Sequence, residues 1–134
     1  MSLPIHHILI ADDDEDDVLM FQSAVEETCP TLVVSIATDG QKLLNLLDKI
    51  SPPDAIVLDL NMPVKGGKEC LREIRANDEF NRVPIIILST SRNKKDIDYC
   101  LLHGANHYFV KPSTYSELRS IVENLCSGRL SVAN

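Results

Sequence analysis

Five short apolar runs, distributed along the whole chain, limit the fold more than any other feature of the sequence. Each run is rich in β-branched or aromatic side chains and is nearly continuous; the runs cover residues 8–11, 32–36, 55–58, 85–88 and 108–110. Runs of this kind are typical of strands that are covered on both faces in a parallel sheet. The sequence therefore predicts a sheet of five parallel strands.

Amphipathic segments with the period of a helix lie between these runs and after the last one. Each segment has one apolar face, and these faces consist of Val18, Phe21 and Val25; Leu43, Leu47 and Ile50; Cys70 and Ile74; Ile97 and Leu101; and Leu118, Ile121, Val122 and Leu125. Five helices that alternate with five strands predict an α/β fold. We expect a doubly wound, right-handed, flavodoxin-like sheet with the strand order 2-1-3-4-5.

Residues at the expected helix ends support this division of the chain. Asp14 and Asp39 are candidate N-caps, and the segment 114–117 (Thr-Tyr-Ser-Glu) has the pattern of a capping box. Gly104 stands where a helix should end. The acidic residues 15–17 are expected to be solvated charges in a first helical turn, where the helix dipole favours them.

Length and composition indicate the class of protein. The chain has 134 residues, which suits one domain, and we expect a domain over residues 5–127, a short tail over 128–134 and no output domain. A net charge of −7 disfavours direct binding to nucleic acid. No apolar run approaches the roughly 18 residues of a membrane span, and the N-terminus lacks the pattern of a signal peptide. Four cysteines without a C-x-x-C pair are expected to be reduced, so we expect a cytoplasmic protein.

Polar side chains follow four of the five predicted strands. The run 8–11 is followed by three aspartates at 12–14, and the run 55–58 is followed by Asp59. The segment 89–91 (Ser-Thr-Ser) and Lys111 follow the next two strands along the predicted sheet. In a sheet of this order, ligands bind beyond the carboxyl ends of the strands at the point between the first and third strands. We therefore expect carboxylates, hydroxyls and one ammonium to converge there.

Electrostatics restricts what such a site can do. Two carboxylates about 4 Å apart repel each other by about 4 kcal/mol at an effective dielectric constant of about 20. A site that holds Asp12, Asp13 and Asp59 must therefore protonate one of them, bind a cation or pair with Lys111. Ligands that are all oxygen atoms suit Mg²⁺. A carboxylate beside a metal ion and an ammonium can attack phosphorus and form an acyl phosphate.

The segments 8–14, 59–67, 84–91 and 104–112 together resemble the receiver domain of two-component response regulators. They occur in the order and at the spacing of that family, and they extend over nearly the whole chain. The short loop 59–63 and the hydroxyl-rich segment 89–91 are similar to stand-alone receivers, including those that serve bacterial phytochromes.

The resemblance implies a role for each matching position. Asp59 would accept a phosphoryl group from the phosphohistidine of a kinase. Asp12, Asp13 and Asp59 would hold Mg²⁺ (or Mn²⁺) together with the backbone carbonyl of Asn61. Lys111 would pair with a phosphoryl oxygen.

Further positions would control the response to phosphorylation. Ser89 and Tyr108 match the switch residues of the family, and Asn61 and Ser91 match positions that modulate the lifetime of the phosphoryl group. The bond between Lys111 and Pro112 is expected to be cis.

The function that follows is that of a signalling module rather than an enzyme with an external substrate. A sensor histidine kinase would phosphorylate Asp59, and the face of the fourth helix, fifth strand and fifth helix would then bind a protein target or a second copy of the chain. A phosphorelay intermediate and a phosphorylation-independent scaffold are alternatives. An aspartyl phosphatase is a further alternative, although Asn61 stands where such hydrolases need an acid–base aspartate.

Overall fold

The structure of the protein is a computed structural model, which describes residues 5–130. A five-stranded parallel sheet lies at its centre, with the strand order β2-β1-β3-β4-β5. The strands are β1 (His7–Ala11), β2 (Val33–Ala37), β3 (Ala55–Leu58), β4 (Ile85–Ser89) and β5 (His107–Val110). The strand order that the sequence predicts is therefore confirmed, and the ends of each predicted strand lie within one residue of the observed ends.

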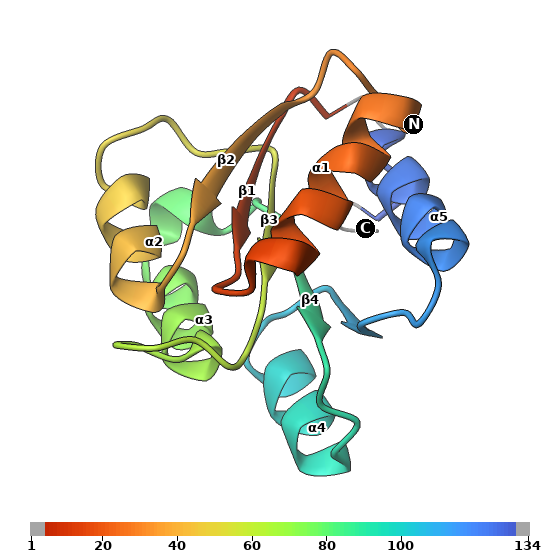
Figure 1. Ribbon diagram of the computed structural model, residues 1–134. Helices are drawn as coiled ribbons and strands as arrows, with labels where there is room; N and C mark the ends of the chain where they lie inside the picture. The colour runs from red at the N-terminus through yellow and green to blue at the C-terminus, as the bar shows by residue number, and fades with distance from the viewer. Residues whose placement is uncertain (1–4, 131–134) are drawn as a thin grey trace.

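Helices cover both faces of the sheet (Figure 1). They are α1 (Glu15–Thr28), α2 (Gly40–Leu47), α3 (Gly67–Ala76), α4 (Lys94–Leu102) and α5 (Tyr115–Cys126), with the short 3₁₀ helix η1 (Asp78–Phe80) after α3. Helices α1 and α5 lie side by side against one face, whereas α2, α3 and α4 lie toward the other. The protein is thus a three-layered α/β structure, as the alternating pattern predicts.

The central strands supply two hydrophobic cores because successive side chains point to opposite faces of a sheet. Leu9 and Ile56 pack with residues of α2 and α3, while Ile8 and Val57 pack with residues of α1 and α5. These side chains are buried, since helices lie on both sides of β1 and β3. This is why the strands have continuous rather than alternating apolar sequences.

Most of the expected helix ends and faces are confirmed. Asp14, Asp39 and Thr114 each accept a hydrogen bond from a backbone N–H in the first turn of the helix that they cap. Gly104 follows α4 with a φ of +103°, a conformation that glycine adopts without strain. Ile50 lies beyond the end of α2 and is half-buried.

The expected apolar face of α4 is wrong. Cys100 is the side chain that α4 buries completely, whereas Ile97 is half-buried and Leu101 is exposed. No helix in the part of the chain that the structure describes combines the length and apolar character needed to cross a bilayer.

Candidate functional site

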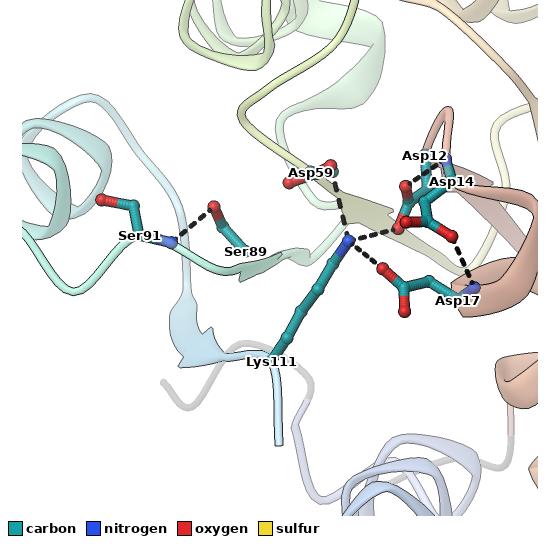
Figure 2. Close-up of polar contacts among 7 residues, drawn as sticks. All are labelled: Asp12, Asp14, Asp17, Asp59, Ser89, Ser91 and Lys111. Carbon is teal, nitrogen blue, oxygen red and sulfur yellow. Dashed lines mark hydrogen bonds and ion pairs between the residues drawn. The ribbon is translucent and has the colours of Figure 1, made fainter. Parts of the chain in front are cut away.

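The carboxyl ends of the central strands place the candidate residues at one edge of the sheet (Figure 2). Ala11 at the end of β1 pairs with Leu58 at the end of β3. The backbone N–H of Asp59 donates to the carbonyl of Ala11 at 3.0 Å, so the next residue of each strand, Asp12 and Asp59, also lies at this edge. At the end of β5, the N–H of Lys111 donates to the carbonyl of Ser89 at 2.7 Å.

Asp12, Asp13 and Asp59 form a cluster of carboxylates. One oxygen of each lies within 4.8 Å of the others. Asp12 and Asp59 are buried, with exposed fractions of 3% and 5%, while Asp13 is exposed. The sequence-based expectation that these side chains would gather is consistent with this geometry.

The surroundings of the Asp59 carboxylate raise its pKa. Burial raises its pKa; Lys111 lowers the pKa in part and Asp12 raises it further. The Oδ1 atom of Asp59 is buried and has no hydrogen-bond partner among the described residues. A buried carboxylate oxygen without a donor, next to two more carboxylates, has the chemistry of a hard-cation ligand. The three residues therefore fit a Mg²⁺ or Mn²⁺ ion.

Lys111 is the cation of the site and lies between carboxylates from three segments (Figure 2). Its Nζ atom is 2.6 Å from Asp17 Oδ2, 2.9 Å from Asp12 Oδ2 and 3.6 Å from Asp59 Oδ2. Burial alone would lower the pKa of Lys111, but hydrogen bonds to Asp17 and Asp12 more than reverse this and raise it. The ammonium therefore stays charged beside Asp59.

Two expectations about this part of the site are wrong. No cis peptide bond occurs among the described residues, so the bond between Lys111 and Pro112 is trans, the isomer that is intrinsically favoured. Asp17 is not simply a solvated charge, because it pairs with Lys111. One feature of the sequence could have indicated this contact. Asp17 is four residues before the buried Phe21, and this spacing places it on the face of α1 that packs against the sheet.

The hydroxyl groups meet around the backbone of Ser91. Ser89 is fully buried, and its Oγ accepts a hydrogen bond from the N–H of Ser91 at 3.2 Å. The half-buried Tyr108 donates its hydroxyl to the carbonyl of Ser91 at 2.7 Å. The Ser91 hydroxyl donates to Asp96 on α4 at 2.5 Å. Both candidate switch residues are thus attached to the same residue of the β4–α4 connection.

The loop after Asp59 is tightly folded. Asn61 is exposed in this loop, two residues beyond the buried acid, and the role of its carbonyl as a ligand stays a prediction. Val64 has a φ of +68°, and the N–H of Lys65 donates to the carbonyl of Pro63 at 2.7 Å across it. A β-branched residue in this region of φ is strained, so the tight turn has an energetic cost.

Comparisons with known proteins agree with this geometry. The family model "Response regulator receiver domain" matches residues 8–123. Response regulator Rcp1 of Synechocystis sp. is 30% identical over 130 residues, which are 92% of this chain and 88% of Rcp1. The sensor histidine kinase TmoS of Ectopseudomonas mendocina is 36% identical over 97 residues, which are 72% of this chain, and the chain spans only 10% of the length of TmoS.

Solved structures give the same result. The phosphorylated cyanobacterial phytochrome response regulator RcpA superposes with a TM-score of 0.86 at 32% identity, covering 97% of each chain. The Mn²⁺-bound form of Rcp1 superposes with a TM-score of 0.83 at 29% identity, covering 96% of this chain and 97% of Rcp1. Since the family match extends over most of the sequence and the acids, hydroxyls and lysine stand at the strand ends within it, the chain belongs to the receiver domain family of response regulators.

Proposed function

We propose that the chain is a single-domain receiver that accepts a phosphoryl group on Asp59 from a histidine kinase in a Mg²⁺-dependent reaction and then changes its binding to another protein. The observation that carries this proposal is the environment of Asp59. Its carboxylate is buried beside Asp12 and Asp13, one of its buried oxygens has no donor among residues 5–130, and Lys111 is 3.6 Å away.

The chemistry requires one bond to form and one to break. An oxygen of Asp59 attacks the phosphorus of the phosphohistidine, the new P–O bond forms, and the P–N bond breaks with its electron pair going to the imidazole nitrogen. Asp12, Asp13 and Asp59, with the Asn61 carbonyl as a further ligand, would hold a Mg²⁺ ion, which would supply positive charge against the phosphoryl oxygens. Lys111 supplies a further positive charge and a hydrogen bond to one of these oxygens.

The contacts of Ser91 support a switch. Once the phosphoryl group is present, Ser89 turns its hydroxyl toward a phosphoryl oxygen and gives up its hydrogen bond to the N–H of Ser91. The β4–α4 connection then moves, so the Tyr108 hydroxyl loses its acceptor, the carbonyl of Ser91. The Tyr108 ring then turns inward. The added charge of up to about −2 is enough to bias such a two-state loop. Asn61 and Ser91 control how long the phosphoryl group persists.

The responding surface is formed by α4, β5 and α5. Leu101 and Leu102 on α4 are exposed by 47% and 81%, so α4 carries apolar side chains that a protein target or a second copy of the chain can cover. The similarity to Rcp1 over 88% of its length supports a receiver domain over residues 5–127. Of the expected tail over 128–134, residues 131–134 lie outside the described residues. The free cysteines of the described chain fit a cytoplasmic location.

The test is Mg²⁺-dependent labelling by acetyl phosphate, followed by intact-mass measurement and peptide mapping. We expect one phosphoryl group on the wild type, none on Asp59→Asn, and none on the wild type when the divalent cation is chelated. Asp39→Asn is a matched control, because it makes the same change at the N-cap of α2 and leaves a side chain that can still cap the helix. Labelling of Asp59→Asn, or no labelling of the wild type, would contradict the proposal.

A further inference from the structure

The ammonium of Lys111 has three N–H groups, and the structure shows where two of them go. Asp17 Oδ2 at 2.6 Å and Asp12 Oδ2 at 2.9 Å lie within hydrogen-bond distance, whereas Asp59 Oδ2 at 3.6 Å does not. Figure 2 shows Asp12 and Asp17 on the same side of the ammonium, with Asp59 on another side. The third N–H of Lys111 therefore remains available on the side of Asp59.

The two partners of Lys111 differ in what else they do. Asp12 belongs to the carboxylate cluster, and its Oδ1 accepts the backbone N–H of Asp14 at 2.9 Å. Asp17 lies outside the cluster, so its contact with Lys111 does not compete with a cation held by Asp12, Asp13 and Asp59.

The backbone of Asp17 is itself held in place. Its N–H donates to the side chain of Asp14, the N-cap of α1, at 3.1 Å. The pKa of Lys111 supports the importance of this contact: burial lowers that pKa, and the hydrogen bond to Asp17 is the largest contribution that raises it again. Asp17 is thus a fixed anchor on α1 for a long, flexible lysine from the end of β5.

We infer that Asp17 is a positioning residue that holds the Lys111 ammonium with one N–H directed at the phosphoryl group on Asp59. Asp17 also keeps the ammonium in this position when a cation binds to Asp12. This inference rests on the proposed phosphorylation of Asp59. Without Asp17, Asp12 alone fixes Lys111 at one point, and the ammonium can rotate about that contact. Orientation of this kind changes the rate of a group transfer without changing the reacting atoms.

The matched variants are Asp17→Asn and Asp16→Asn. Each removes one negative charge from the first turn of α1, but Asp16 is exposed and has no contact with Lys111 among the described residues. A general field effect, or a loss of favourable charge at the start of the helix, would therefore act on both variants alike. Urea unfolding of each variant checks that both are folded.

The first measurement uses the metal-free protein and needs no phosphorylation. In ¹⁵N-labelled protein, an ammonium held by two carboxylates exchanges its hydrogens slowly with water and gives an observable Nζ signal. We expect this Lys111 signal in the wild type and in Asp16→Asn, and we expect it to be lost in Asp17→Asn.

The second measurement is the rate of labelling by acetyl phosphate at saturating Mg²⁺. We expect Asp17→Asn to be slower by about tenfold, and Asp16→Asn to be within about twofold of the wild type. If the wild type is labelled and the two variants have the same rate and the same Lys111 signal, the inference is overturned. If the wild type is not labelled at all, the proposed function fails, while the Nζ signal still decides whether Asp17 anchors Lys111.

Discussion

At the residue scale, the surroundings of Asp59 disfavour the ionised form of its carboxyl group. Its side chain is buried next to Asp12, and the distance of 3.6 Å to Lys111 is too long for a hydrogen bond. Burial accordingly raises the pKa of Asp59. The folded protein therefore has an unfavourable contribution at this residue, which a cation or a change in charge at Asp59 can relieve.

The Asp59→Asn variant should therefore be more stable than the wild type at pH 7 in the absence of divalent cations. In the unfolded chain Asp59 ionises near its ordinary pKa of 3.8, and in the folded protein it ionises at a higher pH. Between these two values the folded state binds more protons, so the Asp59 contribution to the stability falls as the pH rises. The advantage of the variant should fade below pH 3.8. Urea unfolding of the variant and the wild type at pH 7 and below pH 3.8 measures this difference in stability. A wild type that is more stable than the variant at pH 7 would contradict this account.

Gly67 lies close to the backbone of Asp59 and leaves no room there for a side chain. A Cβ atom at Gly67 would lie 2.2 Å from the carbonyl oxygen of Asp59, whereas one at Gly66 would be 3.6 Å from its nearest neighbour, the carbonyl of Leu60. We expect Gly67→Ala to lower the free energy of unfolding by about 1–3 kcal/mol. Gly66→Ala is the control and should lower it by less than about 1 kcal/mol. Equal urea midpoints for the two variants would show that the close approach to Asp59 is not needed.

At the element scale, the β4–α4 connection ties three elements together. Tyr108 of β5 and Asp96 of α4 both bond to Ser91, and Lys68 of α3 pairs with Asp96 at 2.5 Å. Lys68 also lies 5.0 Å from the centre of the Tyr99 ring on α4. The hydrogen bonds of Asp96 with Lys68 and then with Ser91 lower the pKa of Asp96. A movement of Ser91 must therefore be transmitted to α4.

Asp96→Asn should loosen this connection without unfolding the protein. Because the Asp96 pair is partly exposed, its loss should lower the free energy of unfolding by less than about 1 kcal/mol. Amide hydrogen exchange at Ser91 and Asn93 should nevertheless become faster, since Asp96 fixes the Ser91 hydroxyl to which the Asn93 N–H donates. Asp98→Asn, which removes an exposed pair with Lys94 in the same helix, should leave this exchange unchanged. Equal amide exchange at Ser91 and Asn93 in both variants would show that Asp96 does not hold the β4–α4 connection in place.

The α4 helix also shows a limit of sequence patterns. Ile97, Cys100 and Leu101 have the i, i+3, i+4 spacing of a single helix face. Only Cys100, at one side of this face, is fully buried, while Ile97 is half-buried and Leu101, at the other side, is exposed. Periodicity alone selected Ile97 and Leu101, whereas the structure buries Cys100, whose small thiol fits closely against the core. A regular stripe, as at Leu118, Val122 and Leu125 of α5, allowed a correct prediction.

At the scale of the whole molecule, the chain topology could be predicted because it depends on features that the sequence carries directly. The lengths of the runs and of the segments between them determine a parallel sheet, and its order brings the ends of β1 and β3 together. The proximity of Asp12 and Asp59 follows from that order. The pairing of Lys111 with Asp17 does not, because it depends on the conformation of a long side chain across 94 positions of sequence.

The central claim is that Asp12, Asp13 and Asp59 share one divalent cation. Its most direct test is anomalous diffraction from crystals of the protein grown with Mn²⁺. We predict an anomalous peak in contact with carboxylate oxygens of all three residues, and a marked loss of occupancy in Asp59→Asn at the same Mn²⁺ concentration. A peak elsewhere, or none at this edge of the sheet in the wild type, would contradict the account.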